Sequence, residues 1–266
     1  MGMVTGATRA QALVFDIETI ADLTPENRGA IAALAKGRQM TAEQYGAFCA
    51  PLARVICVAW CDVVRQKLGV CLDGTLHTGD LAHVVEVEDE VSAATGRTPC
   101  EMHRCDGEAE VLRNFGGVVD QHCRRAGAQL VTYNGRGFDL PVLVHRSIKH
   151  RVTEGRELLS KAALENRYRP SLHLDLMDVV TFYGAAPRWP MAAYAIGYGF
   201  RSPKNDMDGS QVWAAVQAGR IVDVARYCAG DVLAAVHIYQ CVQGTPPAKA
   251  LRAGLNASHE KAPAPS

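Results

Sequence analysis

Asp16 and Glu18 stand one residue apart at the end of a short, mostly apolar run, residues 12–17. Such a run predicts a strand that is buried on both faces. Because side chains alternate along a strand, both carboxylates point to the same side. Two like charges on one face repel each other unless a cation lies between them, and a divalent cation is the usual solution. The pair therefore predicts a metal site, although Asp-x-Glu alone is also typical of solvated carboxylates.

A second polar segment, Asn134-Gly-Arg-Gly-Phe-Asp139, follows another short apolar run at 129–133. This pattern predicts a strand, a glycine turn and then a helix. Gly135 and Gly137 allow backbone geometry that is closed to other residues, and a close approach by a ligand. Asp139 lies in the first turn of the helix, where the helix dipole by itself also favours an acid.

Tyr227 and Asp231 lie on the last long helix, expected from about Val222 to Cys241. Residues four apart on a helix lie on the same face, one turn from each other. Asp223 falls on the same stripe, while the opposite side is apolar. A polar stripe that faces water is the alternative interpretation of this pattern.

In chain order, the three segments resemble the motifs of the DEDD superfamily of 3′-to-5′ exonucleases, in the subclass with a tyrosine in the third motif. The histidine subclass requires a histidine where this chain has Arg226. The resemblance runs from about Leu13 to Tyr239. It is closest to the proofreading exonuclease domain of family B DNA polymerases and to stand-alone predicted exonucleases related to that domain. The segment from Lys204 to Val212 is similar to one that characterises the stand-alone group.

The resemblance implies a role for each matching position. Four carboxylates would bind metal, and together with a tyrosine that orients the attacking water they would form the catalytic set. Three further residues would line the path of the terminal nucleotide. The metal ligands are Asp16, Glu18, Asp139 and Asp231, the tyrosine is Tyr227, and the nucleotide path contains Thr19, Asn134 and Phe138.

The implied cofactor is Mg²⁺ or Mn²⁺, because hard cations prefer oxygen ligands. Two such ions about 3.5–4 Å apart can clamp the attacking and leaving oxygens of an in-line displacement. Asp16 would bridge both ions, Glu18 and Asp231 would complete the first site, and Asp139 would support the second. The implied substrate is the 3′ end of single-stranded DNA, and the product is a nucleoside 5′-monophosphate.

Two other functions remain open from the sequence. The same chemistry could trim RNA 3′ ends, as in the tyrosine-containing RNase D group, or the chain could be a nucleic-acid-binding module whose catalysis has lapsed. The cluster Cys100-x-x-His103-x-Cys105 offers a weaker zinc hypothesis, because it lacks a matching second half at good spacing. The basic run at 145–151 could guide backbone phosphates or form a solvated helix face.

The elements that must position these residues alternate between strands and helices, which indicates an α/β layer structure. Strands are expected at 12–17, 54–64, 67–72, 129–133 and 171–176. A helix is expected to start at Thr24 and Pro25, and another at a capping Asp106. The resemblance makes the fold RNase H-like, with a mixed five-stranded sheet and helices on both faces. The exonuclease domain would span 10–244, followed by a disordered tail at 245–266.

Composition excludes several classes of protein. The chain has 266 residues, 48% of them hydrophobic, with 28 basic and 28 acidic side chains. This content is too apolar for a disordered chain, and no run approaches the roughly 20 apolar residues that span a bilayer. A protein that coats DNA by bulk charge carries a basic excess, so nucleic acid must bind locally. Nine scattered cysteines without a secretion signal predict reduced thiols and a cytoplasmic location. The oligomeric state stays open.

Overall fold

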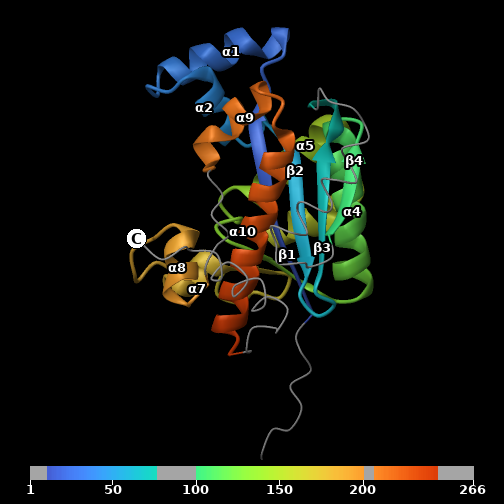
Figure 1. Cartoon of the computed structure of the whole chain (residues 1–266), viewed down its shortest axis with the longest axis vertical. Helices are drawn as coiled ribbons and strands as arrows, with labels where there is room; N and C mark the ends of the chain where they lie inside the picture. The colour runs from blue at the N-terminus through green and yellow to red at the C-terminus, as the bar shows by residue number, and fades with distance from the viewer. Residues whose placement is uncertain (1–10, 77–99, 201–206, 245–266) are drawn as a thin grey trace, which may run out of the picture.

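A computed structural model describes residues 11–76, 100–200 and 207–244. The expected tail at 245–266 lies outside these residues. The described chain forms a six-stranded sheet in the order β4-β3-β2-β1-β5-β6, with helices on both faces (Figure 1). This mixed α/β architecture confirms the expected class and is compatible with an RNase H-like fold. The strands are β1 (Ala12–Ala21), β2 (Ala53–Asp62), β3 (Lys67–Asp73), β4 (Cys100–Cys105), β5 (Gln129–Thr132) and β6 (His173–Asp175).

β1 has an antiparallel neighbour on one side and a parallel neighbour on the other. β1 pairs antiparallel with β2, and β2 antiparallel with β3, while β5 and β6 continue the sheet in parallel. The carboxyl ends of β1, β5 and β6 therefore point the same way. Asp16 of β1 therefore lies level with the ends of β5 and β6, where Asn134 and Asp175 stand.

The expectation of five strands is wrong, because β4 adds a sixth, paired in parallel with β3. Its sequence, Cys-Glu-Met-His-Arg-Cys, lacks the apolar run that predicts a buried strand, and most of its residues are half-buried or exposed. β4 forms the edge of the sheet, where charged side chains discourage pairing with other chains. Hydrophobic patterning alone therefore does not distinguish it from a loop.

Two apolar cores lie on opposite faces of the sheet. One joins the sheet to α10 and contains Val14 and Ile20 of β1; the other joins it to α4 and α5 and contains Leu13 and Phe15. Figure 1 shows α10 crossing in front of the strands, α4 at their right-hand side, and α1 with α2 beyond one end of the sheet. The helices are α1 (Pro25–Lys36), α2 (Ala42–Phe48), α4 (Glu108–Val119), α5 (Asp139–His150), α6 (Arg156–Leu164), α7 (Leu176–Val180), α8 (Met191–Gly197), α9 (Val212–Gln217) and α10 (Ile221–Val242).

The first residues of α1 and α4 can be compared with the helix starts that the sequence predicted. Pro25 occupies the first turn of α1 after an extended Thr24, as expected, although the threonine side chain makes no capping hydrogen bond. Asp106 does not cap α4. Gly107 does so, with a φ of 94° that favours glycine, and the backbone N–H of Asp106 donates to Glu110.

Part of the basic run on α5 belongs to a buried ion-pair network. Arg146 is 1% exposed, and its guanidinium bonds both oxygens of Glu108, at 2.7 and 2.5 Å, and Asp22 at 2.9 Å. Lys149 also binds Asp22, and His150 lies 2.6 Å from Glu108. The network ties α5 and α4 to the chain segment that follows β1. Arg146 and His150 therefore turn inward and cannot guide backbone phosphates, whereas His145, Lys149 and Arg151 are exposed.

All nine cysteines are free thiols, as the sequence predicted. Within the described ranges, no helix has the length and apolar character that crossing a bilayer requires.

Replacing Arg146 with alanine should destabilise the fold by about 3–5 kcal/mol, because it leaves Glu108 and Asp22 buried without their cation. Both carboxylates have a lowered pKa in the folded protein, through their hydrogen bonds to these cations against the cost of burial. Their contribution is therefore present above pH 4 and lost as the pH falls further. Urea unfolding at pH 7 and pH 3 measures both effects. His145→Ala, on the exposed side of the same helix, is the control, and a loss below about 1 kcal/mol at pH 7 would contradict the network's role.

Candidate active site

Asp16 and Glu18 lie on the face of β1 that packs toward α10. Their neighbours on that face, Val14 and Ile20, belong to the α10 core, so the alternation expected from the sequence is confirmed. A register shift between Glu18 and Thr19 marks a β-bulge directly after the pair. Bulges re-aim side chains and occur next to active sites. Glu18 is 8% exposed, so the pair is recessed in the structure.

The other two carboxylates converge on this pair. Burial raises the pKa of Asp16 well above its ordinary value, and the charges of Asp139, Asp231 and Glu18 raise it further. Glu18 shows the same upward shift of its pKa, from burial, Asp231 and Asp139. Such mutual repulsion requires the four groups to lie close together. Residues from β1, α5 and α10, up to 215 positions apart in the chain, thus form a single acidic cluster.

Asp139 and Asp231 belong to two different helices, α5 and α10, and complete this cluster. Burial is the main cause that raises the pKa of Asp139 to about 7, against hydrogen bonds from its own backbone N–H and that of Ile17. The bond from Ile17 joins the start of α5 to β1, between the two first-motif carboxylates. Burial also raises the pKa of Asp231 to about 6, while a hydrogen bond from Tyr227 works in the opposite direction.

Tyr227 lies one helical turn before Asp231, as the spacing predicted, and its hydroxyl donates to that carboxylate. Burial, followed by the charges of Asp231, Glu18 and Asp16, raises the pKa of Tyr227 far above its usual value. The phenol therefore remains protonated. Its hydroxyl lies close to Gly209, where an added Cβ would be 3.9 Å from the phenol oxygen. The characteristic segment seen in the sequence thus borders the site at this glycine.

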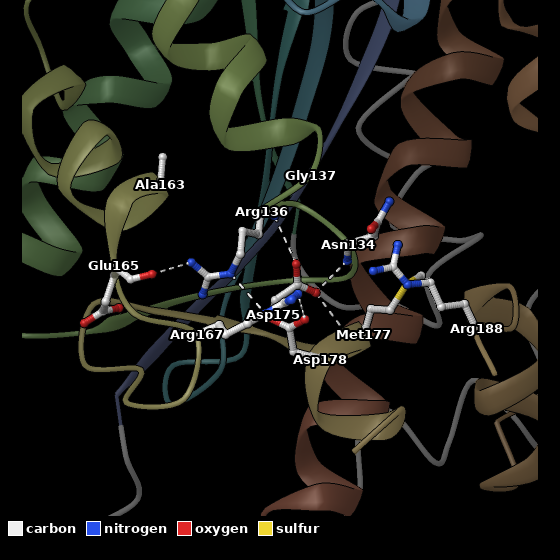
Figure 2. Close-up of a pocket in the computed structure, with 10 residues that line it drawn as sticks. All are labelled: Asn134, Arg136, Gly137, Ala163, Glu165, Arg167, Asp175, Met177, Asp178 and Arg188. Atoms are coloured by element: carbon white, nitrogen blue, oxygen red, sulfur yellow. Dashed lines mark hydrogen bonds and ion pairs between the residues drawn. The ribbon is translucent and has the colours of Figure 1, made fainter. Parts of the chain in front are cut away.

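The turn of the second motif is held by a carboxylate from the neighbouring strand. Asp175, at the end of β6, accepts the backbone N–H groups of Asn134 at 2.8 Å and Arg136 at 3.0 Å (Figure 2). It also accepts from Met177 and so caps α7. Asp175 therefore positions the segment that leads into Asp139.

The sequence predicted that the turn requires glycine at both Gly135 and Gly137, and the structure bears this out for Gly135 alone. A side chain on Gly135 would collide with the Thr132 hydroxyl, so close approach requires glycine here. Gly137 has an ordinary φ, and a side chain there would make only ordinary contacts, whereas the left-handed residue of the turn is Asn134, with a φ of 66°. Asparagine tolerates this conformation better than most residues.

The remaining predicted residues border the cluster through α2. The Thr19 hydroxyl donates to the carbonyl of Ala47 at 3.0 Å, so it anchors α2 to β1. Gly46 allows this contact, because a side chain there would meet Ala21 at 2.5 Å. The half-buried ring of Phe138 lies 6.2 Å from that of Phe48, which is 66% exposed.

Sequence reasoning missed the contributions of Phe48 and Asp175 to this site. Phe48 lies on a helical insertion without any motif, so only the docking of α2 reveals it. Asp175 carried a signal, an acid at the end of a predicted strand, but that signal is equally typical of a helix cap.

The donor set fits hard divalent cations. Among the described residues, ligand atoms of Asp16, Glu18 and Cys228 lie within 4.8 Å of one another. Burial raises the pKa of the Cys228 thiol, which is 3.5 Å from the carbonyl oxygen of Asp16. A protonated thiol is a weak donor, so the four carboxylates are the suitable ligands. In contrast, alternation along β4 places Cys100 and Cys105 on opposite faces, which argues against the zinc hypothesis.

Comparison with protein families gives a match over residues 79–246, to a family described as a predicted 3′-5′ exonuclease related to the exonuclease domain of PolB. The chain belongs to this family. The match spans the second and third motifs with Asp139, Tyr227 and Asp231, and begins after β1. The structure adds Asp16 and Glu18 to the same cluster. A comparison with curated proteins finds no match.

Replacing Asp139 with asparagine should stabilise the metal-free protein at pH 8. The carboxylate binds its proton more tightly in the folded state than in the unfolded chain, so it lowers stability as the pH rises from about 4 to about 7. We expect a rise of about 2–8 °C in the unfolding midpoint in EDTA at pH 8, and a rise less than half as large at pH 5. The added stabilisation by Mn²⁺ should shrink. Differential scanning fluorimetry measures each quantity. Asp106→Asn is the exposed control, and a lower midpoint than wild type in EDTA at pH 8 would contradict the repulsion.

Proposed function

We propose that this protein hydrolyses phosphodiester bonds from the 3′ end of single-stranded DNA and releases nucleoside 5′-monophosphates. The observation that carries this proposal is the convergence of four carboxylates, two buried and two half-buried, and one tyrosine from three distant elements. Their order along the chain and their arrangement agree with the exonuclease family to which the chain belongs.

Asp16, Glu18, Asp139 and Asp231 would hold two Mg²⁺ or Mn²⁺ ions. When bound, such ions lower the pKa of water and stabilise charge on the attacking and leaving oxygens. The carboxylates by themselves repel a phosphodiester, since both carry negative charge. Their recessed position also supports a single-stranded substrate, because a paired end must fray before its last phosphate can reach Glu18 and Asp139, which are 8% and 5% exposed.

Tyr227 would orient the attacking water. Its hydroxyl donates a hydrogen bond to Asp231, so the lone pairs of the phenol oxygen can accept a hydrogen bond from that water. Because the phenol stays protonated, it acts by positioning and not as a base. Phe138 and Phe48 supply apolar surface beside the cluster, where a terminal base can rest.

Asp16→Ala and Asp231→Ala should each lower degradation of a 5′-labelled oligonucleotide by about 10³-fold or more, because each removes a metal ligand. The assay is gel electrophoresis of products in Mg²⁺ or Mn²⁺, with EDTA as a blank. Circular dichroism checks that each variant is folded. Asp223→Ala is the matched control, because Asp223 lies on the same helix but pairs with Arg226 and Arg220.

Retained activity in either folded variant would defeat the assignment. Matched DNA and RNA oligonucleotides, labelled at each end, test polymer and direction in the same assay. A preference for RNA would favour the RNase D-like alternative, and binding without cleavage in Mn²⁺ would favour the lapsed binding module.

Tyr227→Phe keeps the ring and removes only the hydroxyl. We expect kcat to fall about 10²-fold, because the water loses its alignment with the phosphorus. KM should stay within about twofold of the wild-type value. The rise in the unfolding midpoint that Mn²⁺ causes should equal that of the wild type within error, since the carboxylates remain. Steady-state kinetics on a DNA oligonucleotide separates these quantities. A fall in metal stabilisation as large as that of Asp231→Ala would show that Tyr227 acts through the metal site.

A further inference from the structure

A cavity of about 350 Å³ lies beside the turn of the second motif, at the ends of β5 and β6. Asn134 and Gly137 line it from the turn that leads to Asp139, so it adjoins the acidic cluster. Figure 2 shows side chains of the turn, α7 and two loops gathered around it. Its lining residues are Asn134, Arg136, Gly137, Ala163, Glu165, Arg167, Asp175, Met177, Asp178 and Arg188.

Three arginines line this cavity, and they differ in their partners. Arg136 and Arg167 both pair with Asp178, Arg136 at 3.3 Å, and their charges are partly neutralised. Arg188 is exposed and has no side-chain partner within the described part of the chain. Its guanidinium is therefore available to an anion from outside.

Several exposed aromatic residues lie next in sequence to residues that line this cavity. Of six large aromatic side chains that are exposed among the described residues, five lie between residues 168 and 198. Tyr168 and Trp189, 65% and 57% exposed, each directly follow an arginine of the cavity. Tyr183, 37% exposed, packs on Tyr168 with ring centres 5.1 Å apart. We call Tyr168, Tyr183 and Trp189 the aromatic rim.

The backbone near these rings is constrained. Phe182 and Tyr183 have consecutive positive φ angles, 50° and 57°, which residues other than glycine rarely adopt. Such strain persists where the surrounding structure enforces it, and it often accompanies function. The segment around Trp189 is fixed as well, because the Tyr133 hydroxyl donates to the Trp189 carbonyl at 2.5 Å. The rim is thus joined to the end of β5, next to the second motif.

We propose that the cavity and the aromatic rim bind the single strand upstream of the scissile bond, with rings stacked on bases and Arg188 on a backbone phosphate. Exposed aromatics interleaved with a free cation are the features that bind single-stranded nucleic acid without sequence preference. The inference rests on the proposed function, since it needs a strand whose 3′ end enters the acidic cluster. It also agrees with a chain of zero net charge, which must hold a polyanion locally.

Trp189→Ala tests the stacking part by comparing a long with a short substrate. For a 12-nucleotide DNA we expect KM to rise about 5- to 100-fold with kcat unchanged, as the loss of one stacked base predicts. For the p-nitrophenyl ester of thymidine 5′-phosphate, which cannot reach the rim, both constants should match wild type. Ile196→Ala is the matched control, because it removes a 67% exposed apolar side chain from α8 without touching the rim.

Arg188→Gln tests the phosphate contact. Fluorescence anisotropy with a 5′-labelled 12-mer in EDTA gives Kd as a function of salt. The slope of log Kd against log salt should decrease by about 0.7, the value for one phosphate contact on a single strand. Trp189→Ala should weaken binding with little change in this slope.

The outcomes separate this inference from the proposed function. An unchanged KM and Kd for the 12-mer in both variants, with wild-type cleavage intact, would overturn the inference and assign the surface to another partner. Cleavage of neither the ester nor DNA by the wild type would defeat the proposed function, while weaker 12-mer binding by the two variants would still support the strand surface.

Discussion

The repulsion among four carboxylates, of which Glu18 and Asp139 are buried and Asp16 and Asp231 half-buried, is the constraint on which the rest of this structure depends. Burial raises the pKa of all four groups, and the charges of the other members raise the pKa of Asp16 and Glu18 further, so keeping Asp16, Glu18, Asp139 and Asp231 together lowers the stability of the folded chain. A cluster of this kind forms only where the scaffold enforces it, and it attracts either protons or cations. The same repulsion that makes the metal-free site unstable therefore gives it affinity for divalent ions, and makes it hostile to a phosphodiester until they bind.

The scaffold enforces the cluster by giving each carboxylate a separate rigid support. β1 lies inside the sheet and carries two of them, while α10 packs across the same face and brings the fourth. Asp139 depends on several contacts. Asp175 holds the turn of the second motif, and Gly135 lets this turn approach Thr132 closely. The backbone N–H of Ile17 bonds Asp139 and so fixes the start of α5. Since these supports belong to strands that run in parallel to one edge, the parallel half of the sheet positions the chemistry. The antiparallel half mainly buries β1.

The sequence allowed the grouping of the acidic residues to be predicted better than the architecture, for physical reasons. Asp16, Glu18, Tyr227 and Asp231 are spaced by the periods of a strand and a helix, so local geometry alone places each pair on one face. β4 escaped prediction because an edge strand need not be apolar. The inward turn of Arg146 depends on Glu108 and Asp22, far away in the chain, and the place of Phe48 depends on how α2 docks against β1. Long-range packing decides such features, and no local pattern encodes it.

The charge balance of the chain connects the site with the way a strand must be held. With 28 basic and 28 acidic side chains, and four of the acids in a single cluster, long-range attraction for a polyanion is weak. Many of the basic side chains are moreover committed inside the fold, as Arg146 is to Glu108 and Arg167 is to Asp178. Affinity must then come from bound cations at the carboxylates and from contacts that do not depend on net charge, above all stacking on aromatic rings. On the proposed function, a strand would therefore be held by contacts close to the site and not by the electrostatic field of the whole protein.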